Sequence, residues 1–397
     1  MVNDKIAVLG SGITAKSVLA FAKRMHIEVV DVHDASLIIT SPGINPDTFP
    51  KINTPIISDI EWAYRWFQNA KNPPTLIGVT GTNGKSTVTA LISHVCDIPY
   101  AGNIGVPLLD YVGLEDEFPC IVIELSSYQL ETCVDFRPDI AVLLNISPDH
   151  LARHKTMEMY IHEKTKCFIN QTEDDHLLYN EDDDVVVSMI HCAKSKKSSF
   201  SKNAVTDRFG LVKTLMGDHN RLNAAIALKV GALLELDEDT SFRSLHSFKS
   251  LKHRLEFVCD YNGLKIFNDS KATNPESTIL GIKSFTETIS LICCGDDKGL
   301  DLSELVICIG KNVSELILFG GIADRLQALM LQRFPNFLVT KVKDLQEAVA
   351  YGIQSGSNGH VLLFSPASSS FDCFNGFEDR GNQFINGVTS YVEATLA

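Results

Sequence analysis

The stretch GVTGTNGKST, residues 78–87, sets the expectation for the fold of the central part of the chain. It follows the apolar run LIGVT and opens a helical pattern, so its backbone N–H groups and the positive end of the helix dipole would converge on phosphate oxygens. Lys85 would reach the terminal phosphates and Ser86 would bind Mg²⁺. The Walker A pattern has a glycine five positions before Gly84, where this chain has Val79. We therefore predict a strand, a variant phosphate loop and a helix.

Composition narrows the class of protein. The chain has 397 residues, of which 45% are hydrophobic and 21% are charged, and at roughly 150 residues per domain this suggests two or three domains. No apolar stretch has the length of a membrane span, and the opening MVNDKIAVLGSGI predicts a strand and turn instead of a leader peptide. A formal charge of −14 argues against a nucleic-acid partner, and ten scattered cysteines indicate reduced thiols. We expect a cytoplasmic protein that binds neither nucleic acid nor membrane.

Apolar runs and breaks divide the chain into three blocks, each with alternating strand and helix patterns. The first block, residues 1–72, ends at a polar, proline-rich junction. In the second, residues 73–250, the near-continuous apolar runs are typical of strands buried on both faces of a parallel sheet. The third, residues 251–397, begins with a hairpin around Asn262-Gly263. We predict an α/β protein with a small Rossmann-like N-terminal domain, a central P-loop ATPase domain with a parallel sheet, and a Rossmann-like C-terminal domain.

A second nucleotide signal lies near the N-terminus. GSGITA, residues 10–15, follows a strand, opens a helix and fits the dinucleotide fingerprint, with Asp31 where an acidic group would bind a ribose hydroxyl. A dehydrogenase is therefore one interpretation. Only about 60 residues separate the fingerprint from the junction, whereas a full dinucleotide fold needs roughly 150. There is room for one phosphate-bearing nucleotide, or the glycine turn serves packing alone.

Two further polar residues end strands next to the predicted loop. Glu124 ends the strand CIVIE, and His150 follows the next apolar strand in NISPDH. Open α/β sheets bind ligands at the carboxyl ends of their strands. A carboxylate and an imidazole at that edge could hold Mg²⁺ and a substrate phosphate. Each could instead be an ordinary hydrogen-bonded residue at a strand end.

Eight short sequence blocks follow one another along the chain: GVTGTNGKST, GNIGVP, IELSSYQLE, LNISPDH, GDHNRLNAAIA, HRLE, NDSKATNP and SPASSSFDCFNGFEDRG. In content and order they resemble the Mur ligase family of peptidoglycan synthesis, whose phosphate loop has the same variant form. The blocks NDSKATN and SPASSSFD resemble the members that add D-glutamate. The resemblance implies that the carboxylate of UDP-N-acetylmuramoyl-L-alanine attacks the γ-phosphate of ATP, and that the amine of D-glutamate then displaces phosphate from the acyl phosphate.

The resemblance also implies ATP, two Mg²⁺ ions and a carbamylated Lys164, in a monomer whose first domain binds the UDP substrate, whose second binds ATP and whose third binds D-glutamate. The implied catalytic residues are Lys85, Glu124, His150, Lys164 and Lys271. The implied metal-site residues are Ser86, Glu124, His150 and Lys164. The implied nucleotide contacts are Gly81, Thr82, Asn83, Gly84, Lys85, Ser86, Thr87, Asn220, Asn223, Arg254 and Asp269. The implied substrate contacts are Ile13, Thr14, Asp31 and Gly43 for uridine diphosphate, Asn103 for the muramoyl part, and Thr273, Lys298, Ser370, Phe371 and Phe377 for D-glutamate.

The chain departs from the family pattern at several peripheral positions. The N-terminal block is short between Asp31 and Gly43, Asp297 stands where a small residue is usual, Phe371 replaces a common leucine, and Ala152 replaces a common acid. None of these removes a phosphate or metal residue, so we expect an active ligase. Two alternatives stay open: a related ligase with a different amino acid or a folate-type glutamyl acceptor, and a nucleotide-binding regulator without catalysis.

Overall fold

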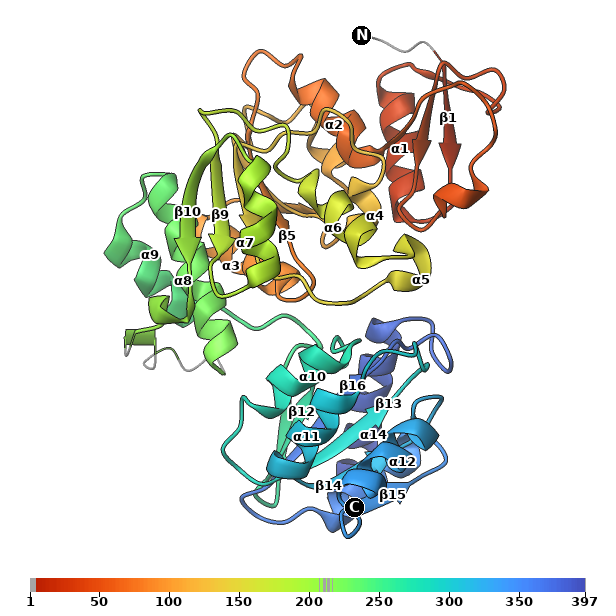
Figure 1. The fold of residues 1–397 in the computed structure, drawn as a ribbon, viewed down its shortest axis with the longest axis vertical. Helices are drawn as coiled ribbons and strands as arrows, with labels where there is room; N and C mark the ends of the chain where they lie inside the picture. Colours follow the sequence, from red (N-terminus) through yellow and green to blue (C-terminus); the bar gives the residue numbers. More distant parts are fainter. Residues whose placement is uncertain (1–4, 207, 210–211, 213–214, 216, 397) are drawn as a thin grey trace. The chain divides into compact units, whose positions relative to one another are not determined.

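The structure, a computed structural model, describes residues 5–206, 208–209, 212, 215 and 217–396 (Figure 1). Contacts within the chain define two compact units, Met1–Val212 with Leu222–Phe248, and Lys213–Arg221 with Lys249–Ala397. The described strands form three sheets, of four, six and six strands. The first two sheets belong to the first unit and the third to the second unit. The predicted α/β class with three sheet domains is confirmed, whereas the predicted domain limits at residues 72 and 250 stay a prediction.

The N-terminal sheet is parallel throughout, in the order β2-β1-β3-β4. A dinucleotide fold uses six strands in two halves of three, so these four strands are too few for both halves. Its strands are β1 (Lys5–Leu9), β2 (Glu28–Val29), β3 (Leu37–Thr40) and β4 (Ile56–Ser58), with helices α1 (Ile13–Arg24) and α2 (Asp59–Phe67).

The central sheet is also parallel, in the order β10-β9-β8-β5-β7-β6. Strand β5 lies between β7 and β8, so the carboxyl ends of these three strands meet around the loop that follows β5. The strands are β5 (Thr75–Thr80), β6 (Tyr100–Gly102), β7 (Cys120–Glu124), β8 (Ile140–Leu143), β9 (His176–Asn180) and β10 (Lys196–Phe200). The helices are α3 (Lys85–Cys96), α4 (Ser127–Leu130), α5 (Leu151–His154), α6 (Met157–Thr165), α7 (Asp184–Met189), α8 (Asp218–Leu233) and α9 (Glu238–Ser244).

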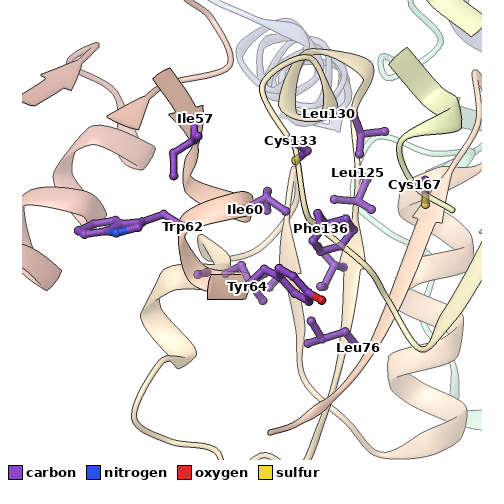
Figure 2. Packing of buried hydrophobic residues seen from close by; sticks show 14 of the residues in the cluster. Ile57, Ile60, Trp62, Tyr64, Leu76, Leu125, Leu130, Cys133, Phe136 and Cys167 are labelled. Atoms are coloured by element: carbon purple, nitrogen blue, oxygen red, sulfur yellow. The ribbon is translucent and has the colours of Figure 1, made fainter. Parts of the chain in front are cut away.

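One hydrophobic core joins the N-terminal and central sheets, and helix α2 contributes to it (Figure 2). The Tyr64 ring meets the Phe136 ring edge-on, with centroids 5.6 Å apart. The buried Glu61 carboxylate, also on α2, accepts hydrogen bonds from the backbone N–H groups of Val134, Asp135 and Phe136. A carboxylate that satisfies three amides in this way stabilises the loop strongly, because charge-assisted bonds exceed neutral ones in strength. The two sheets are therefore fixed to each other within the first unit.

The third sheet forms the core of the second unit, in the order β11-β12-β16-β13-β14-β15. Strands β11 and β12 are antiparallel, and the other neighbouring pairs are parallel. Asn262 and Gly263 both have positive φ, which confirms the predicted hairpin turn. The strands are β11 (Glu256–Tyr261), β12 (Leu264–Asn268), β13 (Ile289–Cys294), β14 (Val313–Leu318), β15 (Leu338–Lys341) and β16 (Val361–Ala367). The helices are α10 (Pro275–Ile282), α11 (Ser303–Asn312), α12 (Ala323–Arg333), α13 (Leu345–Ser355) and α14 (Phe377–Leu396). Over the described residues, no helix combines the length and the apolar composition that crossing a bilayer requires.

Candidate functional site

The phosphate loop connects β5 to α3, as predicted, and its backbone requires glycine at two positions. Gly81 has φ +155°, and a Cβ there would lie 2.9 Å from Leu144 Cβ. Gly84 has φ +85° and precedes the first turn of α3. Side chains other than glycine rarely adopt these angles. Val79 is fully buried inside β5. Because that position belongs to the strand and not to the loop, the loop does not need a glycine there.

Neighbouring strands and helices hold the loop in place. Thr82 Oγ1 lies 3.0 Å from the Tyr160 hydroxyl of α6 and accepts a hydrogen bond from the Ser147 N–H. The Asn83 N–H donates to Asn145 Oδ1 at 2.8 Å, and Asn145 Nδ2 donates back to the Asn83 carbonyl at 3.0 Å. The loop is thus a preformed cradle. Neither Asn145, two residues after the end of β8, nor Tyr160 was among the site residues predicted from the sequence.

Lys85 begins α3 and folds back over the loop. Its Nζ donates to the carbonyls of Gly81, at 2.9 Å, and Thr82, at 2.7 Å. Ser86 is buried in the same first turn, and Thr87 follows it. An added Cβ on Gly84 would lie 3.4 Å from Asn223 Oδ1, so α8 approaches the loop through that side chain. The predicted nucleotide residues of the first unit therefore gather at one loop.

Glu124 ends β7 and is in register with Val79 of β5. Its side chain is buried, and Oε1 accepts a hydrogen bond from Asn103 Nδ2 at 2.7 Å. Its other oxygen, Oε2, is buried without a hydrogen-bond partner among the described groups. A half-satisfied buried carboxylate is costly unless a cation or donor completes it. This oxygen therefore fits an Mg²⁺ ligand, with Ser86 on the neighbouring helix as a second.

Lys164 of α6 is buried against the same loop. Its Nζ donates to the Gly81 carbonyl at 2.7 Å and lies 3.4 Å from Thr80 Oγ1. Burial, and then the charge of Lys85, hold the pKa of Lys164 well below its usual value. This lysine is thus directed toward the phosphate loop and away from solvent. Most lysines on helices are exposed at the surface, and Lys164 is not.

His150 lies at the start of α5 with a positive φ of 56°. Its Nδ1 is 3.1 Å from the Tyr128 hydroxyl, and its Nε2 is 3.6 Å from Asp149 Oδ2. One turn later, His154 is buried with Nε2 2.9 Å from Ser127 Oγ, and burial followed by the neighbouring charge of His150 lowers its pKa to about 4. In the described part of the chain, no cluster of three or more His, Cys, Asp or Glu side chains could bind a metal. Any ion here would need hydroxyl and phosphate oxygens as well as Glu124.

The predicted uridine diphosphate residues surround two turns of the N-terminal sheet. Gly10 has φ +122°, and a Cβ on it would lie 2.4 Å from Ser41 Oγ, so the glycine turn after β1 contacts the loop that contains Gly43. Ile13 begins α1 and is 73% exposed. Thr14 follows it, and Asp31 is exposed just after β2. Asn103, predicted to contact the muramoyl part, holds Glu124 as described above.

The remaining predicted residues lie in the second unit, and several of them contact one another. Asp269 is buried, accepts a hydrogen bond from Ser365 Oγ at 2.8 Å, and has a pKa raised by burial to about 7. Lys271 Nζ lies 3.6 Å from the centre of the Phe377 ring. Lys298 Nζ donates to the Thr273 carbonyl at 3.2 Å. The other predicted residues of this unit are Asn220 on α8, Arg254 before β11, the buried Ser370 and the 76% exposed Phe371.

Two features of the second unit were not predicted. Arg380 of α14 is fully buried and donates to the carbonyls of Ser270 and Ser368, which orders the segments next to the predicted D-glutamate residues. The block that ends in GFEDRG contains both the arginine and Ser368, whereas Ser270 lies 110 residues away in the sequence. Asp297, one of the departures from the family pattern, pairs with Arg325 at 3.1 Å. Its carboxylate is thereby neutralised beside Lys298.

Comparison with known proteins gives consistent matches. The family model of the Mur ligase middle domain matches residues 79–213, and that of the Mur ligase, glutamate ligase domain, matches residues 253–368. The UDP-N-acetylmuramoylalanine--D-glutamate ligase of Caldanaerobacter subterraneus subsp. tengcongensis is 36% identical over 89% of this chain and 83% of its own length. The ligase of the same name from Clostridioides difficile is 34% identical over 91% and 85%. The solved structure of MurF ligase from Thermotoga maritima in complex with ADP has a TM-score of 0.66 at 16% identity, covering 98% of this chain and 95% of that one.

Proposed function

Because the chain belongs to the Mur ligase family, we propose that it is an ATP-dependent ligase that joins D-glutamate to UDP-N-acetylmuramoyl-L-alanine in peptidoglycan precursor synthesis. Relatives that carry this name match it over most of its length. The observation that carries the proposal is the buried Glu124 Oε2 without a partner, on the strand next to the phosphate loop. A buried carboxylate oxygen without a partner destabilises the fold, and a cation bound to phosphate at that edge would remove this cost.

The proposed reaction has two steps. First, a carboxylate oxygen of the UDP-linked substrate attacks the γ-phosphorus of ATP; the bond to the β,γ-bridging oxygen breaks, and an acyl phosphate and ADP form. Second, the D-glutamate amine attacks the acyl carbon, and phosphate leaves from the tetrahedral intermediate as the amine loses its proton. Phosphorylation is needed because a free carboxylate has no adequate leaving group. Catalysis then comes mainly from positioning and charge stabilisation.

The phosphate loop would bind the triphosphate through its backbone N–H groups, and Lys85 would exchange its two carbonyl partners for phosphate oxygens. Ser86 and Glu124 would hold Mg²⁺, which supplies charge neutralisation for the crowded phosphates when it is bound. We propose a second ion near His150 and Lys164. A carbamate on Lys164, formed by addition of its neutral amine to CO₂, would replace a cation with oxygen ligands at a buried position next to Gly81.

The second unit would bind D-glutamate. Lys298 is the natural partner of a substrate carboxylate, and its contact with Thr273 holds the two predicted D-glutamate residues together. Lys271, a predicted catalytic residue, packs on the ring of Phe377, a predicted D-glutamate residue. Ser370 and Phe371 would complete that pocket, while Asn220, Arg254 and Asp269 would contact the nucleotide.

The N-terminal domain, proposed to span residues 1–72, would bind the uridine diphosphate at the paired turns that contain Ile13 and Gly43. Ile13 would offer an apolar surface to a ring, and Asp31 would accept a ribose hydroxyl. We propose residues 73–250 as the ATP domain and 251–397 as the D-glutamate domain. A monomer and a cytoplasmic location stay predictions.

An amino-acid panel tests the proposed function. ADP release is measured with UDP-N-acetylmuramoyl-L-alanine, ATP and Mg²⁺, and with D-glutamate, L-alanine, L-lysine or meso-diaminopimelate as the acceptor. We expect turnover with D-glutamate only, and turnover with another amino acid in its place would refute the choice of substrate. Phosphate release without both organic substrates would indicate a different reaction, and saturable NAD binding would revive the dehydrogenase interpretation.

A further inference from the structure

Arg153, which was not among the residues predicted from the sequence, connects a loop of the N-terminal sheet to the start of α5, where His150 lies. It lies on α5, three residues after His150, and its side chain is 11% exposed. Its Nη1 donates to the Pro42 carbonyl at 2.9 Å and its Nη2 to the Ile44 carbonyl at 2.9 Å. These two carbonyls flank Gly43, one of the predicted uridine diphosphate residues. The guanidinium therefore fixes both sides of that loop residue.

The remaining contacts of Arg153 fix the arginine itself. Its Nε donates to both carboxylate oxygens of Glu131, at 3.0 Å each, and its Nη2 also bonds Glu131. The guanidinium stacks on the Tyr128 ring, with Cζ 4.1 Å from the ring centre. A planar guanidinium can satisfy a carboxylate, two carbonyls and an aromatic face at once, which a lysine ammonium cannot. The side chain thus has one defined position.

Tyr128 extends this set of contacts to His150. The same ring that stacks on Arg153 carries the hydroxyl that lies 3.1 Å from His150 Nδ1. The two rings are 4.8 Å apart between centroids, so the tyrosine also packs on the imidazole. The contacts therefore run without a gap from the backbone of the loop at residues 42–44, through Arg153 and Tyr128, to the imidazole.

We propose that Arg153 and Tyr128 are positioning residues that couple binding of the uridine diphosphate part of the substrate to the orientation of His150. This proposal rests on the proposed function, because it assigns the loop at residues 42–44 to the nucleotide substrate. When the diphosphate binds that loop, the two carbonyls hold the guanidinium, the guanidinium holds the tyrosine ring, and the hydroxyl holds Nδ1 of the imidazole. The described contacts already hold His150, and substrate bound to the loop would stabilise them further, so that binding of the correct substrate favours this orientation.

A nearby contact serves as the control. Lys155 Nζ pairs with Asp47 Oδ2 at 2.9 Å and also joins the N-terminal domain to the central domain. Both side chains are mostly exposed, at 54% and 65%. Exposed pairs of this kind contribute little to stability. Lys155→Gln therefore removes a contact between the same two domains without touching the substrate loop or the histidine.

The test compares four variants, Arg153→Met, Tyr128→Phe, the double variant and Lys155→Gln. Calorimetry measures binding of UDP-N-acetylmuramoyl-L-alanine and, separately, of a non-hydrolysable ATP analogue; steady-state kinetics gives kcat and each KM. For Arg153→Met we expect about tenfold weaker binding of the UDP substrate, from the loss of a charge-assisted hydrogen bond, and ATP-analogue binding within about twofold of wild type. For Tyr128→Phe we expect unchanged substrate binding and about fivefold lower kcat. Lys155→Gln should behave as wild type.

The double variant decides between coupling and general damage. If Tyr128 and Arg153 act through the same contacts, Arg153→Met should also lower kcat, by a factor similar to that of Tyr128→Phe. In the double variant, Tyr128→Phe should then add almost nothing to that loss. Three results would overturn the proposal: kcat losses that multiply in the double variant, binding of the UDP substrate and of the ATP analogue that is weakened equally, or UDP-substrate binding within twofold of wild type in Arg153→Met. Wild-type protein that binds the UDP substrate but uses another amino acid would refute the proposed function and leave this comparison intact. Wild-type protein that does not bind the UDP substrate would count against both.

Discussion

Replacing Glu124 with glutamine separates the function of this residue from its contribution to stability. In Glu124→Gln the amide oxygen still accepts from Asn103 Nδ2, and the amide nitrogen takes the position of the unpartnered Oε2. Neutralising the charge weakens one hydrogen bond by about 1 kcal/mol, and it removes a cost of about 1–3 kcal/mol for a half-satisfied buried carboxylate. We expect the free energy of unfolding to stay the same or to rise by up to about 2 kcal/mol. Activity should fall at least about 100-fold, since a cation ligand next to the triphosphate is lost.

Glu315 of β14 provides the matched control, because it is a buried glutamate whose oxygens are both satisfied. Its Oε1 accepts from the Tyr351 hydroxyl at 2.8 Å and its Oε2 from Ser355 Oγ at 2.9 Å. In Glu315→Gln both of these hydrogen bonds lose their charge assistance, so the free energy of unfolding should fall by about 1–3 kcal/mol while turnover stays at the wild-type level below the melting temperature. Urea titrations and kcat/KM for each substrate measure both quantities. A Glu124→Gln enzyme with more than a tenth of wild-type activity, or with the stability loss expected of the control, would refute the reasoning.

Three other substitutions test separate parts of the structure. Lys85→Ala should abolish turnover and weaken ATP binding in calorimetry, and an unaltered rate would remove the phosphate loop from the mechanism. Lys164→Ala should lose most activity and regain part of it with added formate or acetate, which would replace the carbamate oxygens; no rescue at any concentration would argue against a carbamate. Burial raises the pKa of Asp59 from 3.8 to about 7, so its contribution to stability is full below pH 4 and is lost as the pH rises through 7. Asp59→Asn should remove up to about 4 kcal/mol of that decline. Urea unfolding followed through the chain's two tryptophans, which lie on the same helix α2, measures it; equal declines in both proteins would contradict the assignment.

Local sequence predicted the parts of the site that depend on local geometry. The strand, the glycine loop and the helix are consecutive in the sequence. The roles of Gly81, Gly84 and Lys85 therefore depend only on local backbone conformation and could be predicted from the sequence. Glu124 was predicted from its place at the end of a buried strand, because parallel strands end at one edge of a sheet.

The contacts that complete the site join residues far apart in the sequence, and no local pattern indicated them. The bond from Asn103 to Glu124 spans 21 residues, and that from Arg153 to the Pro42 carbonyl spans 111. Every residue has a backbone carbonyl, so the sequence does not indicate which carbonyl will accept a hydrogen bond. The buried Arg380 was missed for the same reason, since two of its partners are carbonyls of Ser270 and Ser368.

Transfer of an oxygen isotope tests the central claim most directly. UDP-N-acetylmuramoyl-L-alanine labelled with ¹⁸O in its carboxylate is turned over with ATP, Mg²⁺ and D-glutamate, and the released phosphate is analysed by mass spectrometry. If ATP activates the carboxylate as an acyl phosphate, one labelled oxygen must appear in each phosphate. Amide product accompanied by unlabelled phosphate would contradict the account, because the carboxylate would then have been activated without bonding to phosphorus.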